Sequence, residues 1–160
     1  MKKKFIFLCL IFIGLFLNAC ASKNENFTSQ SVSIFIFSPN IRLNDNGFLK
    51  QDKQKINLEV YKFGRAFFEL NISDKICTSG VCYDKTSFNK KFFKNVYYDE
   101  FLEDILLLKP LFNGKNLTNT DCGFYQNLIS KNYEILYEKC DEGINFRDNI
   151  SHTSIRLLYI

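Results

Sequence analysis

Six cysteines and one histidine are the side chains of this sequence with the widest range of chemistry. Four of the cysteines, Cys77, Cys82, Cys122 and Cys140, lie where apolar and polar residues alternate. In an exported chain they could form disulfides in any of three pairings, remain free thiols or bind a metal ion. Their spacing suits zinc poorly, and a Ser-Gly pair between the first two is typical of a hairpin that brings two Cα atoms to the ~5.5 Å of a disulfide. We therefore expect two structural disulfides, Cys77–Cys82 and Cys122–Cys140, and no metal site.

Enzymatic chemistry has little support among the remaining residues. His152 is the only imidazole, and Ser151-His152 lies in a polar segment expected to be a turn between strands. The sequence contains no nucleophile elbow, paired-carboxylate motif or glycine-rich phosphate loop. The prediction is that the protein is not an enzyme and uses no cofactor.

The charge balance argues against nucleic acid as a partner. The formal net charge is +4, from 21 basic and 17 acidic residues. Three of those basic residues are Lys2, Lys3 and Lys4, and no acidic residue occurs among the first 19. Without this segment the balance is 18 basic against 17 acidic residues, or +1. A nearly neutral domain lacks the basic surface that binds phosphate backbones.

The amino-terminal residues have the order of an export signal. Three lysines precede an apolar run from Phe5 to Leu17, which is too short to cross a ~30 Å hydrocarbon core as a helix. The run ends in Leu17-Asn-Ala-Cys20, which resembles the bacterial lipobox, and the resemblance implies that Cys20 becomes the acylated first residue of the mature chain. The alternative is an ordinary signal peptide that ends by chance in cysteine. We predict a signal peptide over 1–19, a lipidated cysteine and polar tether over 20–31, and one domain over 32–160.

Several acyl chains form a stable membrane anchor, because each buried CH₂ contributes ~0.8 kcal/mol. Ala21 and Ser22 follow Cys20, and no aspartate stands beside it. By resemblance to lipoproteins of enteric bacteria, this absence favours the periplasmic face of the outer membrane.

The rest of the chain predicts an antiparallel α+β domain. Apolar residues alternate with polar ones in several short segments, and turn-forming residues separate these segments. Asn44 to Gly47 has the composition of a turn, and Gly64 is placed to allow a hairpin. One helix is expected over 98–108, capped by Asp99 and ended by Pro110. The expected strands include residues 32–36, 56–60, 66–72, 133–137, 144–146 and 155–159.

Several strands are apolar on both faces. The second apolar set consists of Phe35, Phe37, Phe67, Leu136, Leu158 and Ile160. In a one-layer sheet one face would pack the core and the other could line a cavity. The alternative is a sandwich or helix-covered sheet that buries both faces.

The order of these elements resembles the LolB family, the outer-membrane lipoprotein receptors of the Lol pathway. The resemblance is carried by Ile56 to Leu70, by the Gly-containing hairpin from Cys77 to Tyr83, by Tyr98 to Leu111 and by the last two strands. It implies a half-open antiparallel β-barrel of the LolB/LolA type, with one or two helices covering its concave side. It also implies that the protein receives lipoproteins from a periplasmic carrier, binds their acyl chains and aids their insertion into the outer membrane.

In this family an apolar residue before the loop glycine protrudes and is needed for membrane insertion. The corresponding loop here is Lys62-Phe63-Gly64-Arg65, and an apolar side chain flanked by cations suits an anionic membrane interface. The alternative is a Phe63 folded back onto the sheet. The candidate acyl-binding residues are Phe35, Phe37, Phe67, Phe101, Ile105 and Leu108.

A second function is a structural accessory lipoprotein, without lipid binding, that grips an outer-membrane assembly or export complex by a sheet edge. An apolar cavity beside an exposed Phe63 would favour acyl binding. A filled core with a bare edge strand would favour the accessory function.

Overall fold

The computed structural model describes residues 28–160, which form one antiparallel sheet with two short helices. The predicted signal peptide, Cys20 and the predicted tether as far as residue 27 lie outside the described residues. The first strand begins at Thr28, within the segment expected to be tether. The strands are β1 (Thr28–Phe37), β2 (Arg42–Gln51), β3 (Ile56–Lys62), β4 (Arg65–Ile72), β5 (Ile76–Thr78), β6 (Val81–Tyr83), β7 (Leu117–Thr120), β8 (Gly123–Ile129), β9 (Glu134–Cys140), β10 (Gly143–Asp148) and β11 (Thr153–Tyr159). The helices are α2 (Lys85–Phe93), α3 (Phe101–Leu106) and the short 3₁₀ turn η1 (Phe112–Gly114).

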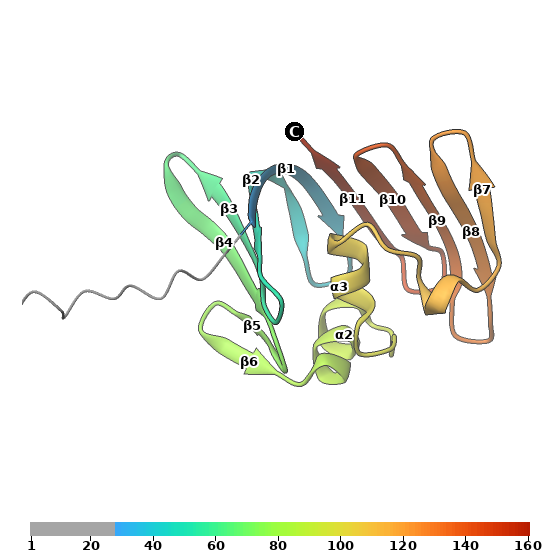
Figure 1. The fold of residues 1–160 in the computed structure, drawn as a ribbon. Coiled ribbons are helices and arrows are strands. Elements are labelled where there is room, and N and C mark those ends of the chain that lie inside the picture. Colours follow the sequence, from blue (N-terminus) through green and yellow to red (C-terminus); the bar gives the residue numbers. More distant parts are fainter. Residues whose placement is uncertain (1–27) are drawn as a thin grey trace, which may run out of the picture.

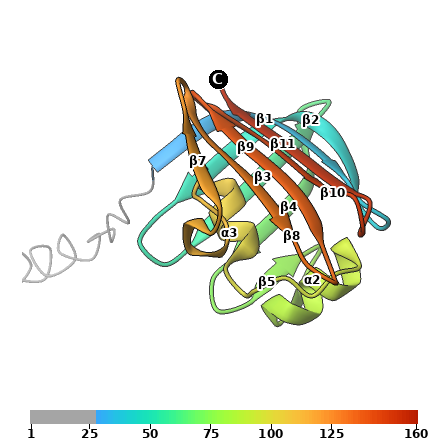
Figure 2. The ribbon, with the colours of Figure 1, turned by 90° about the vertical axis from the view of Figure 1, so that its right-hand side faces the viewer.

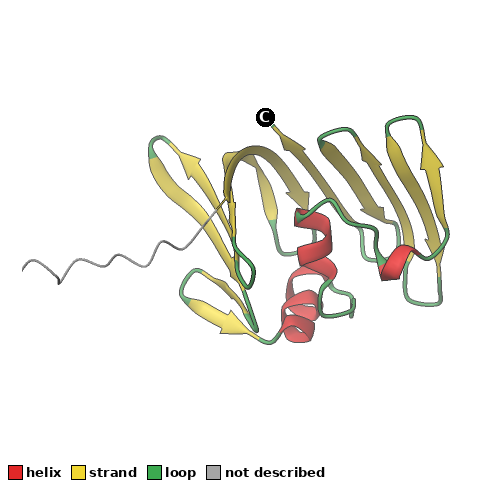
Figure 3. Cartoon of the chain, in the orientation of Figure 1, coloured by secondary structure: helices red, strands yellow, loops and turns green. Residues whose placement is uncertain are grey.

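The sheet consists of two meanders joined by its first and last strands. Its order is β6-β5-β4-β3-β2-β1-β11-β10-β9-β8-β7, so β6 and β7 are the edges. The connection between these two edges carries both helices. Figures 1 and 2 show the sheet curving over the helices, and Figure 3 shows the helices (red) inside the curve. The expected open antiparallel α+β architecture is confirmed.

Alternation along the strands decides which side chains face the helices. In β1, Val32, Ile34 and Ile36 are buried, whereas Phe37 points to the opposite face and is exposed. The largest fully buried side chains include Tyr137, Phe88, Phe93, Phe101 and Phe146, which belong to both helices and to β9 and β10. The core therefore lies between the concave face of the sheet and the α2–α3 segment.

The predicted turn at Asn44 to Gly47 is wrong, because these residues lie inside β2. They pair without interruption with β1, from Asp45 opposite Ile34 to Gly47 opposite Val32. The actual turn precedes them, where the Ser38 hydroxyl accepts a hydrogen bond of 3.0 Å from the Ile41 amide. Gly47 is needed for close approach rather than for a turn, since a Cβ there would lie 2.2 Å from the carbonyl oxygen of Glu59.

The helical segment differs from the expected single helix. An additional helix, α2, is capped at its amino terminus by Asp84, whose carboxylate accepts a hydrogen bond of 2.8 Å from the Ser87 amide. Helix α3 ends at Leu106, before the left-handed residue Leu108. Asp99 does not cap it; its carboxylate accepts instead from the Thr86 hydroxyl, at 2.7 Å.

Among the residues that the structure describes, no helix is both long and apolar enough to cross a membrane.

Candidate functional site

Both predicted disulfides are present. Cys77–Cys82 joins β5 to β6 with a Cα–Cα distance of 4.0 Å. Cys122–Cys140 joins the turn before β8 to the end of β9 with a Cα–Cα distance of 4.8 Å. The four sulfurs are thereby committed to structural bonds. Within residues 28–160, no group of three or more His, Cys, Asp or Glu side chains could hold a metal ion.

The β3–β4 hairpin ends in a two-residue turn with an exposed aromatic side chain. Phe63 has φ of 51° and Gly64 has φ of 75°, and the flanking Lys62 and Arg65 pair with each other. Phe63 is 96% exposed, so the alternative of a side chain folded onto the sheet does not hold. A non-glycine residue with positive φ carries a conformational cost of ~1 kcal/mol. The turn geometry alone would therefore favour a residue other than phenylalanine at this tip.

Other aromatic side chains surround the base of this hairpin. Phe67 is 62% exposed, and the Lys62 ammonium lies 5.5 Å from the centroid of its ring. On β2, Phe48 packs against Tyr61 with ring centroids 5.9 Å apart. We call Tyr61, Lys62, Phe63, Arg65 and Phe67 the hairpin cluster.

The acidic residue nearest to the hairpin cluster is neutralised within the sheet. Glu59 accepts hydrogen bonds from Lys50 at 2.9 Å and from the Tyr61 hydroxyl at 2.7 Å. These bonds hold the pKa of the Glu59 carboxyl below its usual value, and the bond to Glu59 raises the pKa of Lys50. The positive charges of Lys62 and Arg65 are thus left unopposed by this carboxylate.

The six candidate acyl-binding residues do not form one site. Phe101 and Ile105 belong to α3 and are fully buried, and Leu108 is half-buried just beyond that helix. Phe35, Phe37 and Phe67 belong to the outer face of the sheet, on the side away from the helices. The second apolar set predicted for the strands is therefore real, but it lies on the convex face.

The concave side is filled rather than hollow. Tyr97 stacks on Phe101 with ring centroids 3.9 Å apart, and Phe146 of β10 lies 5.3 Å from Phe101. A cavity of about 600 Å³ opens between the β2–β3 loop, the β4–β5 turn and α3, but its walls are largely polar and include Lys55, Asp74 and Lys109. An acyl chain could reach the apolar concave surface only if the α2–α3 segment moved away.

Polar bonds hold the last turn of α2 and the end of α3 to the sheet and its turns, and the Thr153 hydroxyl of β11 donates to the carbonyl of Phe93 at 3.4 Å. The Ser38 hydroxyl donates to the carbonyl of Phe92 at 2.7 Å, and the Tyr159 hydroxyl donates to the carbonyl of Leu106 at 2.8 Å. Lys85 and Glu103 form an ion pair between α2 and α3. The helices are thus linked to each other and tied to the sheet near the ends of each helix.

A buried polar cluster fixes the loop between the helices. Asp148, at the end of β10, accepts hydrogen bonds from the Tyr97 hydroxyl at 2.6 Å and from the Asn95 amide at 3.0 Å. Its other oxygen accepts from the backbone amides of Glu134 at 3.1 Å and Ile150 at 3.0 Å. Burial opposes ionisation of Asp148, but these donors outweigh it and hold the carboxyl pKa below its usual value. Sequence reasoning missed this cluster, because no local pattern connects its members.

Ser151 and His152 are not arranged as a catalytic pair. The Ser151 hydroxyl is buried 2.9 Å from the Tyr97 hydroxyl. His152 is exposed in the β10–β11 turn with φ of 54°. Within the described part of the chain, no hydrogen bond joins the two side chains.

No protein-family model matches the sequence, and a search of curated proteins finds no match.

Proposed function

We propose that the protein is a membrane-anchored, LolB-like lipoprotein that binds acyl chains of other lipoproteins and aids their insertion into the outer membrane. The observation that carries the proposal is the cover of the concave sheet face. A single segment between the two edge strands supplies it, rather than a second sheet. A cover of this kind can move off as a unit and leave an apolar surface for an acyl chain.

The hairpin cluster supports the membrane side of this proposal. Phe63 is almost fully exposed between two cations, at a turn where its backbone conformation is unfavourable. An aromatic ring with flanking cations is stabilised at an anionic lipid interface.

The length of chain between Cys20 and the first strand is compatible with membrane contact through this hairpin. Ser31, near the start of β1, pairs with Phe48, whose ring packs on Tyr61. Seven residues lie between Cys20 and Thr28, and the eight Cα-to-Cα steps that join these two residues span at most about 29 Å. Thr28 pairs with Gln51, and Gln51 pairs with Ile56 at the start of β3, so the chain enters the sheet at the end of β3 opposite the Phe63 turn. A tether of this length still leaves the hairpin cluster within reach of the membrane.

Acyl binding can be tested on residues 20–160 with Cys20→Ala, since all eleven described strands pair within this range. A triacylated lipopeptide is titrated without detergent, and amide hydrogen exchange is followed by mass spectrometry. We expect saturable one-to-one binding together with faster exchange over residues 85–106, as the helices leave the sheet. Absence of binding at concentrations that saturate a known acyl carrier would overturn the proposal.

Phe63→Glu is expected to retain lipopeptide binding but to weaken association with anionic vesicles by about tenfold, because it removes an inserted ring and adds repulsion. Vesicle co-sedimentation of the same Cys20→Ala chain measures this effect. Phe37→Glu is the matched control, since Phe37 is also exposed on the outer face of the sheet but lies on β1, outside the hairpin. Equal vesicle binding by the two variants would contradict a role for the hairpin.

The second candidate function is a structural accessory lipoprotein. The filled core favours it, and so do the exposed edge strands β6 and β7, each paired on one side only within the described sheet. Such edges can accept a strand from a partner protein. Absence of lipopeptide binding would favour this accessory function over acyl binding.

A further inference from the structure

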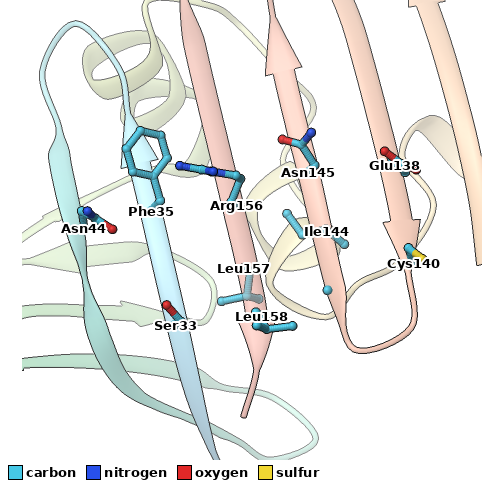
Figure 4. A pocket seen from close by; sticks show the side chains of 11 residues that line it. Ser33, Phe35, Asn44, Glu138, Cys140, Ile144, Asn145, Arg156, Leu157 and Leu158 are labelled. Atoms are coloured by element: carbon cyan, nitrogen blue, oxygen red, sulfur yellow. The ribbon is translucent and has the colours of Figure 1, made fainter.

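The outer face of the sheet contains a shallow hollow, lined by both polar and apolar side chains, that the acyl-binding proposal does not use. It has a volume of about 430 Å³ and extends over strands β2, β1, β11, β10 and β9 (Figure 4). It lies on the opposite side of the sheet from α2 and α3. Its lining includes Ser33, Phe35, Asn44, Glu138, Asn145 and Arg156.

Small residues on either side of a leucine create the hollow. Leu158 pairs with Ser33 on one side and with Gly143 on the other. A Cβ at Gly143 would lie 3.1 Å from the carbonyl oxygen of Leu157 and 3.3 Å from Leu158 Cδ1. The Cys122–Cys140 disulfide fixes the end of β9 at the rim. The floor is therefore held by backbone and disulfide, and a larger residue at 143 would fill it.

Arg156 stands over this floor with its guanidinium stacked on an aromatic ring. The guanidinium carbon lies 4.5 Å from the centroid of Phe35, its cross-strand neighbour. Stacking leaves the N–H groups at the edge of the guanidinium plane free to donate in a fixed direction. No carboxylate in residues 28–160 forms a salt bridge with Arg156. The Arg156 guanidinium, a planar group of N–H donors without a carboxylate partner in the described chain, is therefore suited to bind the carboxylate of a ligand.

Polar side chains extend this site along one row across the strands. Asn44 pairs with Phe35, Arg156 pairs with Asn145, and Asn145 pairs with Glu138. Arg156 and Glu138 are thus two strand spacings apart, or about 10 Å. In the described chain, the side chains of Asn44, Asn145 and Glu138 take part in no hydrogen bond. Amide groups and a carboxylate in this position can bind hydroxyls.

We propose that this hollow binds an acidic saccharide, with its carboxylate on Arg156 and its hydroxyls on Asn145, Asn44 and Glu138. The hollow is shallow and its lining is mixed, which suits a saccharide, because sugar rings present C–H faces to apolar side chains such as Leu158 and hydroxyls to polar ones. Its row of about 10 Å accommodates two sugar rings. Glu138 provides an acceptor for hydroxyl groups and repels a densely anionic surface. The site is independent of acyl binding, because it lies on the other face of the sheet.

The test is a titration of the full chain with digalacturonic acid, in a zwitterionic detergent without a sugar headgroup, followed by calorimetry. We expect saturable one-to-one binding. Arg156→Gln should weaken it by about tenfold or more, since a charge-assisted hydrogen bond is lost. The matched control is Arg42→Gln: Arg42 is exposed on the same face and lies 5.2 Å from the Phe37 ring, but it does not line the hollow. Binding by the control should be unchanged.

Further arms of the titration separate the alternatives. Equal affinity for a neutral disaccharide would overturn the role of Arg156 as a carboxylate partner. Binding of triglutamate but not of the saccharide would overturn the ligand class in favour of an acidic peptide. Absence of binding, or equal weakening by Arg42→Gln, would overturn the site itself. Thermal unfolding of each variant checks that exposed substitutions have left the fold intact.

Discussion

Replacing Asp148 with asparagine is expected to lower the free energy of unfolding by about 3 kcal/mol. The variant keeps the shape of the side chain but loses its charge and one acceptor oxygen. The Tyr97 hydroxyl and the Asn95 amide both donate to the same oxygen, and two backbone amides donate to the other. In the asparagine variant an NH₂ group replaces one of these oxygens. That group cannot accept the two hydrogen bonds that the oxygen accepted, so two donors lose their acceptor. Urea denaturation followed by far-UV circular dichroism measures the change.

The control for this substitution is Asp121→Asn. Asp121 is exposed in the β7–β8 turn, and its side chain forms no hydrogen bond within the described residues. We expect its free energy of unfolding to stay within about 0.5 kcal/mol of the parent. If the two variants were equally stable, the hydrogen bonds of Asp148 would contribute no more to the free energy of unfolding than an exposed aspartate does.

The Asp148 contribution should depend on pH in a defined direction. Hydrogen bonds hold the pKa of its carboxyl below the value of ~3.9 in an unfolded chain. A lowered folded-state pKa stabilises the fold above the unfolded value, and this stabilisation is lost as pH falls through the folded one. The difference between parent and Asp148→Asn should therefore be constant above about pH 5 and shrink below about pH 4. A difference that does not change between pH 7 and pH 3 would show that charge is not its source.

The strands could be predicted from sequence where the local pattern and the tertiary environment agree. Residues 32–36 alternate in the sequence and have one face on the core, and the hairpin at Gly64 requires positive φ at the tip. Strand β2 could not be predicted in this way, because the sequence from Asn44 to Gly47 has the composition that turns prefer. Their conformation is decided by pairing with β1, and such a partner is not visible in a local window.

The candidate sites differ in the same respect: one follows from the local sequence, and the others depend on residues far apart in the chain. Phe63 could be found because its exposure follows from the turn that contains it. The site at Arg156 could not be found from the sequence, since the contact of Arg156 with Phe35 depends on the register between the first and last strands. Asp148 and Tyr97 are separated by 51 residues and meet only because the helical segment packs into the curve of the sheet. Long-range pairing therefore determines both of the sites that sequence reasoning missed.

Phe101→Ala is expected to lower the free energy of unfolding by about 4 kcal/mol, because it removes a fully buried ring at the start of α3. Phe101 packs against Tyr97 and Phe146, with ring centroids 3.9 and 5.3 Å away. Phe67→Ala is the control: that ring is 62% exposed, and we expect a loss below about 1 kcal/mol. Denaturant unfolding measures both.

The milder variant Phe101→Leu tests whether α2 and α3 move off the sheet or are a fixed part of the core. If α2 and α3 must leave the sheet before an acyl chain enters, a weaker closed state raises the fraction of open molecules and hence the apparent affinity. We therefore expect Phe101→Leu to unfold more easily than the parent yet to bind the triacylated lipopeptide more tightly. Lower stability combined with unchanged or weaker lipopeptide binding would mean that opening of this segment does not limit acyl binding. The helices would then be a fixed part of the core, as an accessory protein that docks by its sheet edges requires.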